Sequence, residues 1–465
     1  MTRYKVFVWA FMLASVFAKG WAQDYRQKVE NFCLPVMDIY TVNSEEPTCD
    51  YVTHPKGAMG ESIANATKVP ARMYMTMLAD TLYDSGEYEK DQSGLTIRIR
   101  GNTSAYGVKK PYKLKLQKKK DLLLRGDNDT YKDKDWLLMP LSIYTITGLK
   151  VNELIGMPYT PRYRFVNVFI NDNYRGIYML MESIKRNEKC RIDVDEDGFI
   201  VELDAYWWNE EVYFPTIMHT YNGKGYKYTF KYPDADDVDE DIISHIQDKI
   251  NEMEKSMAEG TYPDVIDVET FAKWLLGHDI LGTWDSGGSN RFFAKYDDGA
   301  FSKIFIPCMW DFDSMAKMDY EWARIHQDDI YYKMLFQSTN TEFTETYLDL
   351  WENLSHDIFT EINQYFDNIT RTDEWDAVEK SLLLDQKRWN YNDCTLAEDA
   401  DNVCKWLNDR QKWMNETIND IKVGDAGTVH NFVYSIGGVF QCKYKDFLRL
   451  PRGIYIVNRK KVFIK

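Results

Sequence analysis

The stretch TWDSGGSNRFFAKYDDGAFSKIFIPCMWDFDSM, residues 283 to 315, carries carboxylates and an amide in an order that suits metal-assisted chemistry. Asp285 precedes Asn290 by five residues, and Asp311 and Asp313 flank a phenylalanine after an apolar run. Two alternating segments, RFFAKY and FSKIFIPCMW, are joined by Asp-Asp-Gly, which predicts a β-hairpin. The hairpin would fold Asp311 back toward Asp285 and Asn290. Converging oxygen ligands of this kind suit a hard divalent ion such as Mg²⁺, which completes its shell with phosphate and water.

The order of these residues is also the order found in phosphoryl-transfer sites. In protein kinases an Asp accepts the proton of the attacking hydroxyl, an Asn five residues later binds metal, and a further metal-binding Asp follows in Asp-Phe-Gly. Asp285, Asn290 and Asp311 occupy those places, and Asp313 stands where the glycine would be. The alternative interpretation is that Asp285 and Asn290 cap turns while Asp311 and Asp313 end a strand.

Paired carboxylates can also hydrolyse glycosidic bonds. Asp285 and Asp311 lie next to Trp284 and Trp310, and such aromatic side chains often stack on sugars. The sequence contains no barrel repeat or sugar-enzyme motif that supports this reading.

Phosphoryl transfer also needs cations and backbone amides on the phosphates, and the first half of the chain offers both. RIRGNTS places the small residues Gly101, Asn102, Thr103 and Ser104 between two alternating segments. In PYKLKL, Lys113 and Lys115 share one strand face, which is also what a solvated face would show. Two acidic residues compete as the partner of such a lysine, namely Glu182 and Glu153.

The surrounding periodicity predicts a strand-rich half followed by a helix-rich half. A short helix is expected at 71–84 and another at 142–154. Strands are expected from Leu95, through YRFVNVFIN and RGIYMLMESIK, to about residue 232. Beyond residue 234 the apolar residues recur at helical spacing over 235–259, 267–281 and 341–423. The fold class is therefore α+β.

Composition and charge limit the number of domains and the classes of partner that the protein can have. The 465 residues are 44% hydrophobic and 15% aromatic, which is enough for two or three domains with substantial cores. The formal net charge of −16 disfavours a nucleic-acid partner.

Both ends of the chain carry export features. Residues 1–22 read as a signal peptide, with a basic start, a short apolar run and small residues before cleavage. No later segment is long and apolar enough to span a membrane. In the resulting oxidising compartment, Cys33 with Cys49 and Cys394 with Cys404 could close short loops, whereas Cys308 is expected to be packed in an apolar strand.

The last residues, LPRGIYIVNRKKVFIK, resemble the C-terminal sorting domain of the type IX secretion system of Bacteroidetes, so residues 425–465 are expected to form a β-type sorting tail that could attach the protein to the surface. An ordinary final hairpin is the alternative.

Taken together, several segments resemble the spore coat protein H (CotH) family of atypical secretory kinases. They are RIRGNTS, KKPYKLKL, VFINDNYRGIYMLMESIKR, GFIVELD, the loop from Asp285 to Asn290, and WDFD, in family order. The resemblance implies a divergent two-lobed protein-kinase-like fold over residues 91–424, with the strand-rich lobe ending near 232 and residues 23–90 as an N-terminal extension. It further implies a secreted or cell-surface kinase that uses ATP with Mg or Mn to phosphorylate hydroxyl groups of exported proteins.

The resemblance also assigns roles to residues. Asp285 would be the catalytic base, and Lys115, or Lys113 as second choice, would contact the nucleotide phosphates. Asn290 and Asp311, with Asp313, would hold metal, and Gly101 to Ser104 would cover the phosphates, with Glu182 nearby. The sequence departs from the family after Asp313, where SMAKMDY replaces the usual glycine and aromatics. The alternative function is therefore a catalytically inactive surface protein of this family that binds a partner, a glycan or a host cell.

Overall fold

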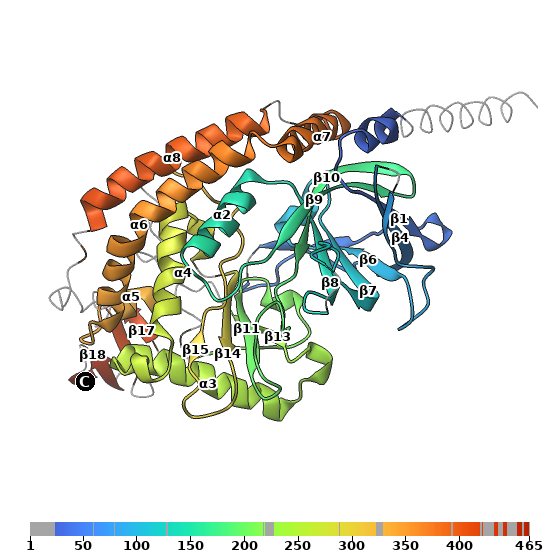
Figure 1. Ribbon diagram of the computed structural model, residues 1–465. Helices are drawn as coiled ribbons and strands as arrows, with labels where there is room; N and C mark the ends of the chain where they lie inside the picture. The colour runs from blue at the N-terminus through green and yellow to red at the C-terminus, as the bar shows by residue number, and fades with distance from the viewer. Residues whose placement is uncertain are drawn as a thin grey trace, which may run out of the picture.

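The computed structural model describes residues 24–421, with gaps at 59, 79, 127–128, 217, 219–226, 288, 322–328, 392–393 and 419–420, and four strands of the C-terminal segment. The predicted signal peptide lies outside these residues. Figure 1 shows the blue to green strands of the first half on the right of the molecule and most of the yellow to orange helices on the left. The predicted order, strand-rich half before helix-rich half, is confirmed.

The first half forms one large sheet that closes on itself. Its strands run in the order β1-β9-β10-β8-β7-β6-β4-β5, and the additional pairing of β1 with β4 completes a barrel. Closure removes unpaired edges from this part of the sheet. The strands are β1 (Val36–Thr41), β4 (Val69–Met77), β5 (Asp80–Asp84), β6 (Leu95–Ile99), β7 (Tyr112–Lys120), β8 (Asp133–Pro140), β9 (Tyr163–Ile170) and β10 (Asn173–Glu182). A small hairpin of β2 (Asp50–Thr53) and β3 (Glu61–Ala64) lies outside this sheet.

The helix predicted at 71–84 is wrong, because this stretch forms β4 and β5. Ala71, Met73 and Met75 are fully buried and alternate with partly exposed residues, so the apolar period is two and not 3.6. The segment expected as an N-terminal extension thus supplies three strands of the barrel sheet.

Residue parity along each strand separates two hydrophobic cores. Tyr178 and Leu180 of β10 fill the barrel interior together with residues such as Leu114 and Trp136. Their neighbours Ile177, Met179 and Met181 point outward and join the larger core shared with the helices. The barrel wall on this side is therefore buried on both faces.

A second sheet continues the chain and leads into the helices. Its order is β12-β13-β11-β14-β15, all antiparallel. The strands are β11 (Phe199–Asp204), β12 (Tyr213–Phe214), β13 (Lys227–Tyr232), β14 (Arg291–Lys295) and β15 (Ile304–Phe305). The predicted hairpin of β14 and β15 is confirmed, although β15 is shorter than the apolar run suggested.

The helices pack around this sheet and against the barrel wall. They are α2 (Ile143–Leu154), α3 (Glu240–Glu259), α4 (Val268–Leu281), α5 (Ile330–Phe336), α6 (Glu342–Ile369), α7 (Asp373–Trp389) and α8 (Leu396–Thr417). Figure 1 shows α2 between the barrel strands and the helices α4 and α6. Among the helices of the described residues, none combines the length and hydropathy needed to cross a membrane.

The C-terminal strands form a separate small sheet. β16 (Phe432–Ser435), β17 (Phe440–Lys443), β18 (Gly453–Val457) and β19 (Lys460–Ile464) pair antiparallel in the order β17-β16-β18-β19. Elsewhere, Cys33, Cys49 and Cys404 are free thiols, so neither of the short loops considered above is closed by a disulfide. Cys308 is buried, as predicted.

Candidate active site

The loop after α4 presents Asp285 at the surface. The helix ends at Gly282, whose φ of 64° is the left-handed conformation that favours glycine at a helix C-terminus, and a short 3₁₀ turn from Trp284 to Ser286 follows. Asp285 is exposed, and its backbone amide donates to the Ser314 hydroxyl at 3.3 Å. This bond ties the loop to the segment after the Asp-Phe-Asp motif.

The hairpin brings Asn290 and Asp311 into contact. The Asn290 side-chain amide donates to Asp311 Oδ2 at 3.1 Å, across a separation of 21 residues. Both residues have a left-handed backbone, with φ of 56° and 60°. Such conformations are uncommon outside glycine and concentrate at functional sites, where the surrounding structure holds them in place.

Asp311 carries an excess of negative charge around it. Burial raises the pKa of Asp311 to about 6, and the charges of Asp313 and Asp285 add to the rise, while Arg100 opposes it. A divalent cation at this point would relieve the repulsion. Within the described residues no group of three His, Cys, Asp or Glu side chains is close enough to form a closed metal site. The paired amide and carboxylate oxygens of Asn290 and Asp311 are ligands of the kind that Mg²⁺ accepts, since this ion takes one or two protein ligands and binds mainly to phosphate and water.

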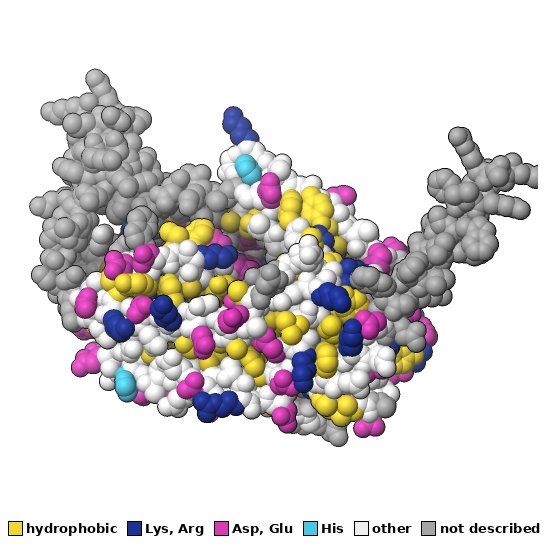
Figure 2. Space-filling model, turned by 90° about the horizontal axis from the view of Figure 1, so that it is seen from above, with side chains coloured by type: hydrophobic (Ala, Val, Ile, Leu, Met, Phe, Trp, Pro, Cys, Tyr) yellow, Lys and Arg dark blue, Asp and Glu magenta, His cyan; other side chains and the backbone are white. Residues whose placement is uncertain are grey.

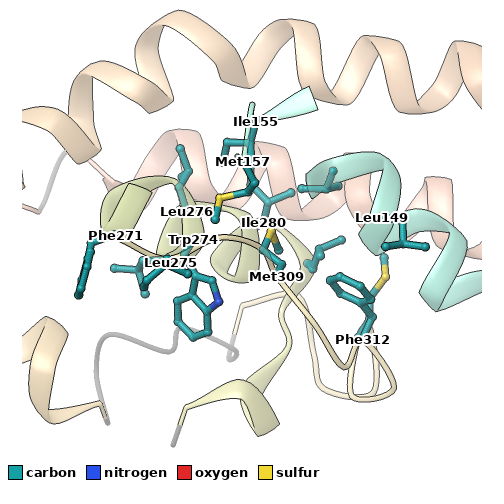
Figure 3. Close-up of a cluster of buried hydrophobic side chains, with 14 of the residues drawn as sticks. Leu149, Ile155, Met157, Phe271, Trp274, Leu275, Leu276, Ile280, Met309 and Phe312 are labelled. Carbon is teal, nitrogen blue, oxygen red and sulfur yellow. The ribbon is translucent and has the colours of Figure 1, made fainter. Parts of the chain in front are cut away.

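Phe312, between the two aspartates, anchors the motif in the core. Figure 3 shows its ring beside Leu149 of α2, in the cluster that also contains Met309 and α4 residues. A Cβ atom added to Gly148 of α2 would lie 2.1 to 2.6 Å from three ring carbons of Phe312. The ring also stacks with His278, at 6.2 Å between centroids. The position of Asp311 thus depends on the close packing of the Phe312 ring against Gly148 of α2.

The barrel supplies cations on its outer face. Arg98 of β6 is directly opposite Lys113 of β7, and Thr96 is opposite Lys115. Lys113 Nζ lies 3.1 Å from Asp135 Oδ1, and Lys185 Nζ lies 2.7 Å from the other oxygen. Burial opposes ionisation of Asp135, but the two lysines outweigh it and hold its pKa well below the usual range. Lys115 is exposed and forms no ion pair with any described residue.

Neither acidic residue suggested as the lysine partner has that role. Glu182 is buried and binds Arg125 at 2.8 Å, the Tyr159 hydroxyl and the Arg162 amide. In the register of β10 and β8, Glu182 is opposite Trp136, whose side chain points into the barrel, whereas both lysines point outward. Glu153 pairs with Lys150 and Arg162 on the surface of α2.

The Gly101–Ser104 loop bridges the barrel and the second sheet. Gly101 has φ of 90°, and a Cβ atom there would lie 2.3 Å from Ser104 Oγ, so only glycine fits. Asn102 accepts from the Ser62 hydroxyl at 2.6 Å, and the Thr103 hydroxyl lies 3.0 Å from that of Tyr206, just beyond β11. The loop therefore links the barrel to the segment that follows β11.

Three residues near the site were not predicted from the sequence. Glu202 and Asp204 lie on one face of β11, and Glu202 pairs with Lys231 at 2.7 Å. Burial, followed by the charge of Glu202, raises the pKa of Asp204 to about 7. Arg100 follows β6, and the charges of Asp311, Glu202 and Asp313 act on it from across the gap. The alternation of FIVELD places both acids on one face, which is the signal that could have revealed them.

A family model described as CotH kinase protein matches residues 97–414. The chain belongs to the CotH kinase family. The match covers the cation-bearing strands, the Asp285 loop, the Asp-Phe-Asp motif and the helices up to α8. No curated protein matches the chain significantly.

The surface of the CotH protein carries charged side chains of both signs and is hollowed in places. In Figure 2 acidic and basic side chains are mixed over the face shown, and acidic side chains lie inside a hollow. A surface hollow of about 700 Å³ lies between the end of α2, the start of α4 and α6. Its lining includes Glu269, Lys273, Asp349 and Leu350 and none of the residues discussed above. Chemistry is therefore assigned to the Asp311 region and not to this hollow.

Proposed function

We propose that this CotH protein is a metal-dependent protein kinase that transfers the γ-phosphoryl group of ATP to hydroxyl groups of exported or surface proteins. The observation that carries the proposal is the contact of Asn290 with Asp311, with the charges of Asp285, Asp313 and Arg100 acting on Asp311. Acidic metal ligands opposite phosphate-binding cations are what phosphoryl transfer requires.

The residue roles follow from exposure and position. Asp285 is exposed, so its carboxylate can take the proton of an acceptor hydroxyl while that oxygen bonds to the γ-phosphorus and the bond to the ADP oxygen breaks. The amide oxygen of Asn290 and the carboxylate of Asp311 would hold the metal, with Asp313 beside them. The loop from Gly101 to Ser104 would cover the phosphates. A bound Mg or Mn ion would neutralise charge on the phosphate oxygens.

Lys113 replaces Lys115 as the preferred phosphate-binding lysine. The charge of Asp311 acts on Arg100. Arg100 comes two residues after Arg98, which is opposite Lys113. Lys115 lies a further two residues away along the strand, about 7 Å farther from the site. Lys113 also has an orienting carboxylate in Asp135, a role that a glutamate on a helix serves in protein kinases.

We further propose that the barrel acts as the nucleotide-binding lobe and that the second sheet with its helices acts as the catalytic lobe of a kinase-like fold. The protein would be exported by its signal peptide and sorted by residues 425–465. The separate four-stranded sheet of that segment supports a compact tail. Its acceptor substrates would then be exported proteins.

The test is phosphoryl transfer by the purified full chain, with γ-labelled ATP, Mn²⁺ or Mg²⁺ and a serine-rich acceptor protein. Asp285→Asn and Asp311→Asn should each lower the transfer rate by more than about 100-fold, with unchanged circular dichroism. Asp357→Asn, at an exposed position of α6, is the matched control and should transfer normally. Equal transfer by all four proteins, or none by the wild type with any metal, would contradict the proposal.

A further inference from the structure

Arg100 is a partly buried guanidinium with little in the protein to bind. Its Nη1 donates to Met139 Sδ at 3.1 Å, and within the described residues it forms no ion pair. A thioether is a weak acceptor, and a guanidinium has five N–H donors arranged in a planar fork. Because burying such a group without anionic partners is costly, the remaining donors need an anion or water.

The effect of burial on the pKa of Arg100 is larger than the opposing effect of three nearby carboxylates. Desolvation lowers the pKa of Arg100, and the charges of Asp311, Glu202 and Asp313 only partly offset it. None of the three carboxylates is close enough to form a salt bridge with it. Glu202 instead binds Lys231, and Asp311 binds Asn290. The guanidinium therefore faces the acidic site across a gap.

Arg100 lies where it could contact a phosphate bound between the loop and the proposed metal ligands. Its backbone amide donates to Pro111 O at 3.1 Å, which fixes it at the base of the Gly101–Ser104 loop. Arg98 and Lys113 continue the same outer face of the barrel behind it. An anion bound to Arg100 would therefore lie next to the loop and near the charges of Asp311 and Asp313.

We propose that Arg100 binds the terminal phosphates of the nucleoside triphosphate through its guanidinium, as a second phosphate anchor besides Lys113. This inference rests on the proposed kinase function, because it takes the nucleotide as the anion. It is more specific than that function, because it assigns bidentate binding of the polyphosphate to an arginine, in addition to the lysine of the strand.

The experiment is isothermal titration calorimetry of the full chain in excess Mn²⁺ with adenosine, ATP and tripolyphosphate as probes. Arg100→Gln should weaken ATP and tripolyphosphate binding about 10- to 100-fold, because a charge-assisted contact is lost, and leave adenosine binding unchanged. Arg100→Lys should lose less, since it keeps the charge but not the fork. Arg72→Gln, which removes a barrel arginine already paired with Asp84 and Glu87, is the control and should bind all probes normally.

Two results separate this inference from its alternatives. If Arg100→Gln weakens Mn²⁺ binding without nucleotide as much as it weakens ATP binding, Arg100 acts through Asp311 and the proposal is overturned. The same holds if ATP binding is unchanged in Arg100→Gln, and the kinase proposal would then stand without it. If the wild type binds neither adenosine nor ATP, the kinase proposal fails. Arg100 is then judged on tripolyphosphate alone, where a loss in Arg100→Gln supports an anion site and equal or absent binding overturns it.

Discussion

Replacing Gly148 with alanine should uncouple the position of Asp311 from the folding of the protein. The added methyl carbon would lie 2.1 Å from the nearest ring carbon of Phe312. Ordinary carbon–carbon contacts are about 3.5 Å or longer. The ring must therefore retreat by about 1.4 Å, and it carries the residues on both sides of it.

The cost in stability should be modest. Overpacking a core costs about 1 to 3 kcal/mol. Alanine in place of glycine inside a helix recovers about 1 kcal/mol. The net loss in the free energy of unfolding should then be about 0 to 2 kcal/mol, which leaves a chain of this size folded.

The loss in activity should be larger. A displacement of about 1 Å at a reacting centre can reduce the rate about 100-fold. We expect Gly148→Ala to transfer phosphate about 100-fold more slowly, as measured by single-turnover transfer from γ-labelled ATP, and urea unfolding will give the stability change. The double variant Gly148→Ala with Phe312→Leu should recover much of the rate, because the smaller side chain makes room for the methyl group.

A second glycine provides the matched control. Gly277 lies in α4, and a Cβ atom there would meet Met309 Sδ at 2.5 Å. That contact is the flexible part of a methionine, which can rotate away. Gly277→Ala should therefore lose less than about tenfold in rate. If Gly148→Ala keeps the wild-type rate while Gly277→Ala does not, the anchoring role of Phe312 is refuted.

Three further changes test other parts of the reasoning. Burial lowers the pKa of His278 from its usual 6.5 to about 3, so below pH 6.5 the unfolded state gains a proton that the folded state does not accept, and stability falls until the pH approaches 3. Between pH 7 and 5 the wild type should therefore lose about 2 kcal/mol more in free energy of unfolding than His278→Gln, and equal slopes in urea unfolding would contradict this. Lys113→Met should lower phosphoryl transfer at least about tenfold and Lys115→Met less than about threefold, and the reverse order would restore Lys115 as the phosphate ligand. Arg410, which donates to Asp279 O at 2.9 and 2.6 Å and also to Tyr320 O, should cost about 3 kcal/mol in unfolding free energy when changed to methionine; a loss below about 1 kcal/mol would show that those carbonyls find other donors.

The parts of the site that were predicted from sequence are those that local pattern controls. The two-residue period and the Asp-Asp-Gly turn define a hairpin, and a hairpin necessarily brings its ends together, so the approach of Asn290 and Asp311 followed from the sequence. The left-handed backbone at both residues did not, because asparagine and aspartate adopt that conformation only occasionally and no spacing in the sequence marks where they do.

The parts that were missed depend on which face of a strand meets which neighbour. Glu182 was a reasonable partner for a strand lysine until the register of β10 and β8 turned it toward the barrel interior. Asp135 comes from a strand adjacent in the sheet, and the charge of Asp311 acts on Arg100 only because the tertiary fold brings the end of β6 near the Asp-Phe-Asp segment. No spacing in the sequence encodes these pairings. The helix expected at 71–84 failed for a simpler reason, since a short apolar stretch rich in Met and Ala is compatible with either period.

The position of the proposed phosphate lysine and the position of the proposed metal-binding aspartate are set by different means. Lys113 is oriented by Asp135, and because their strands β7 and β8 are neighbours in the sheet, hydrogen bonds fix the distance between them. Asp311 is placed by the packing of Phe312 on α2, a side-chain contact between the helix and a loop. A shift of α2 would therefore move Asp311, the proposed metal ligand, and leave the pair of Lys113 and Asp135 intact. In protein kinases the lysine pair itself includes a helix residue, so a helix movement breaks it. In this CotH protein, a change at α2 should thus reduce metal binding before it reduces nucleotide binding.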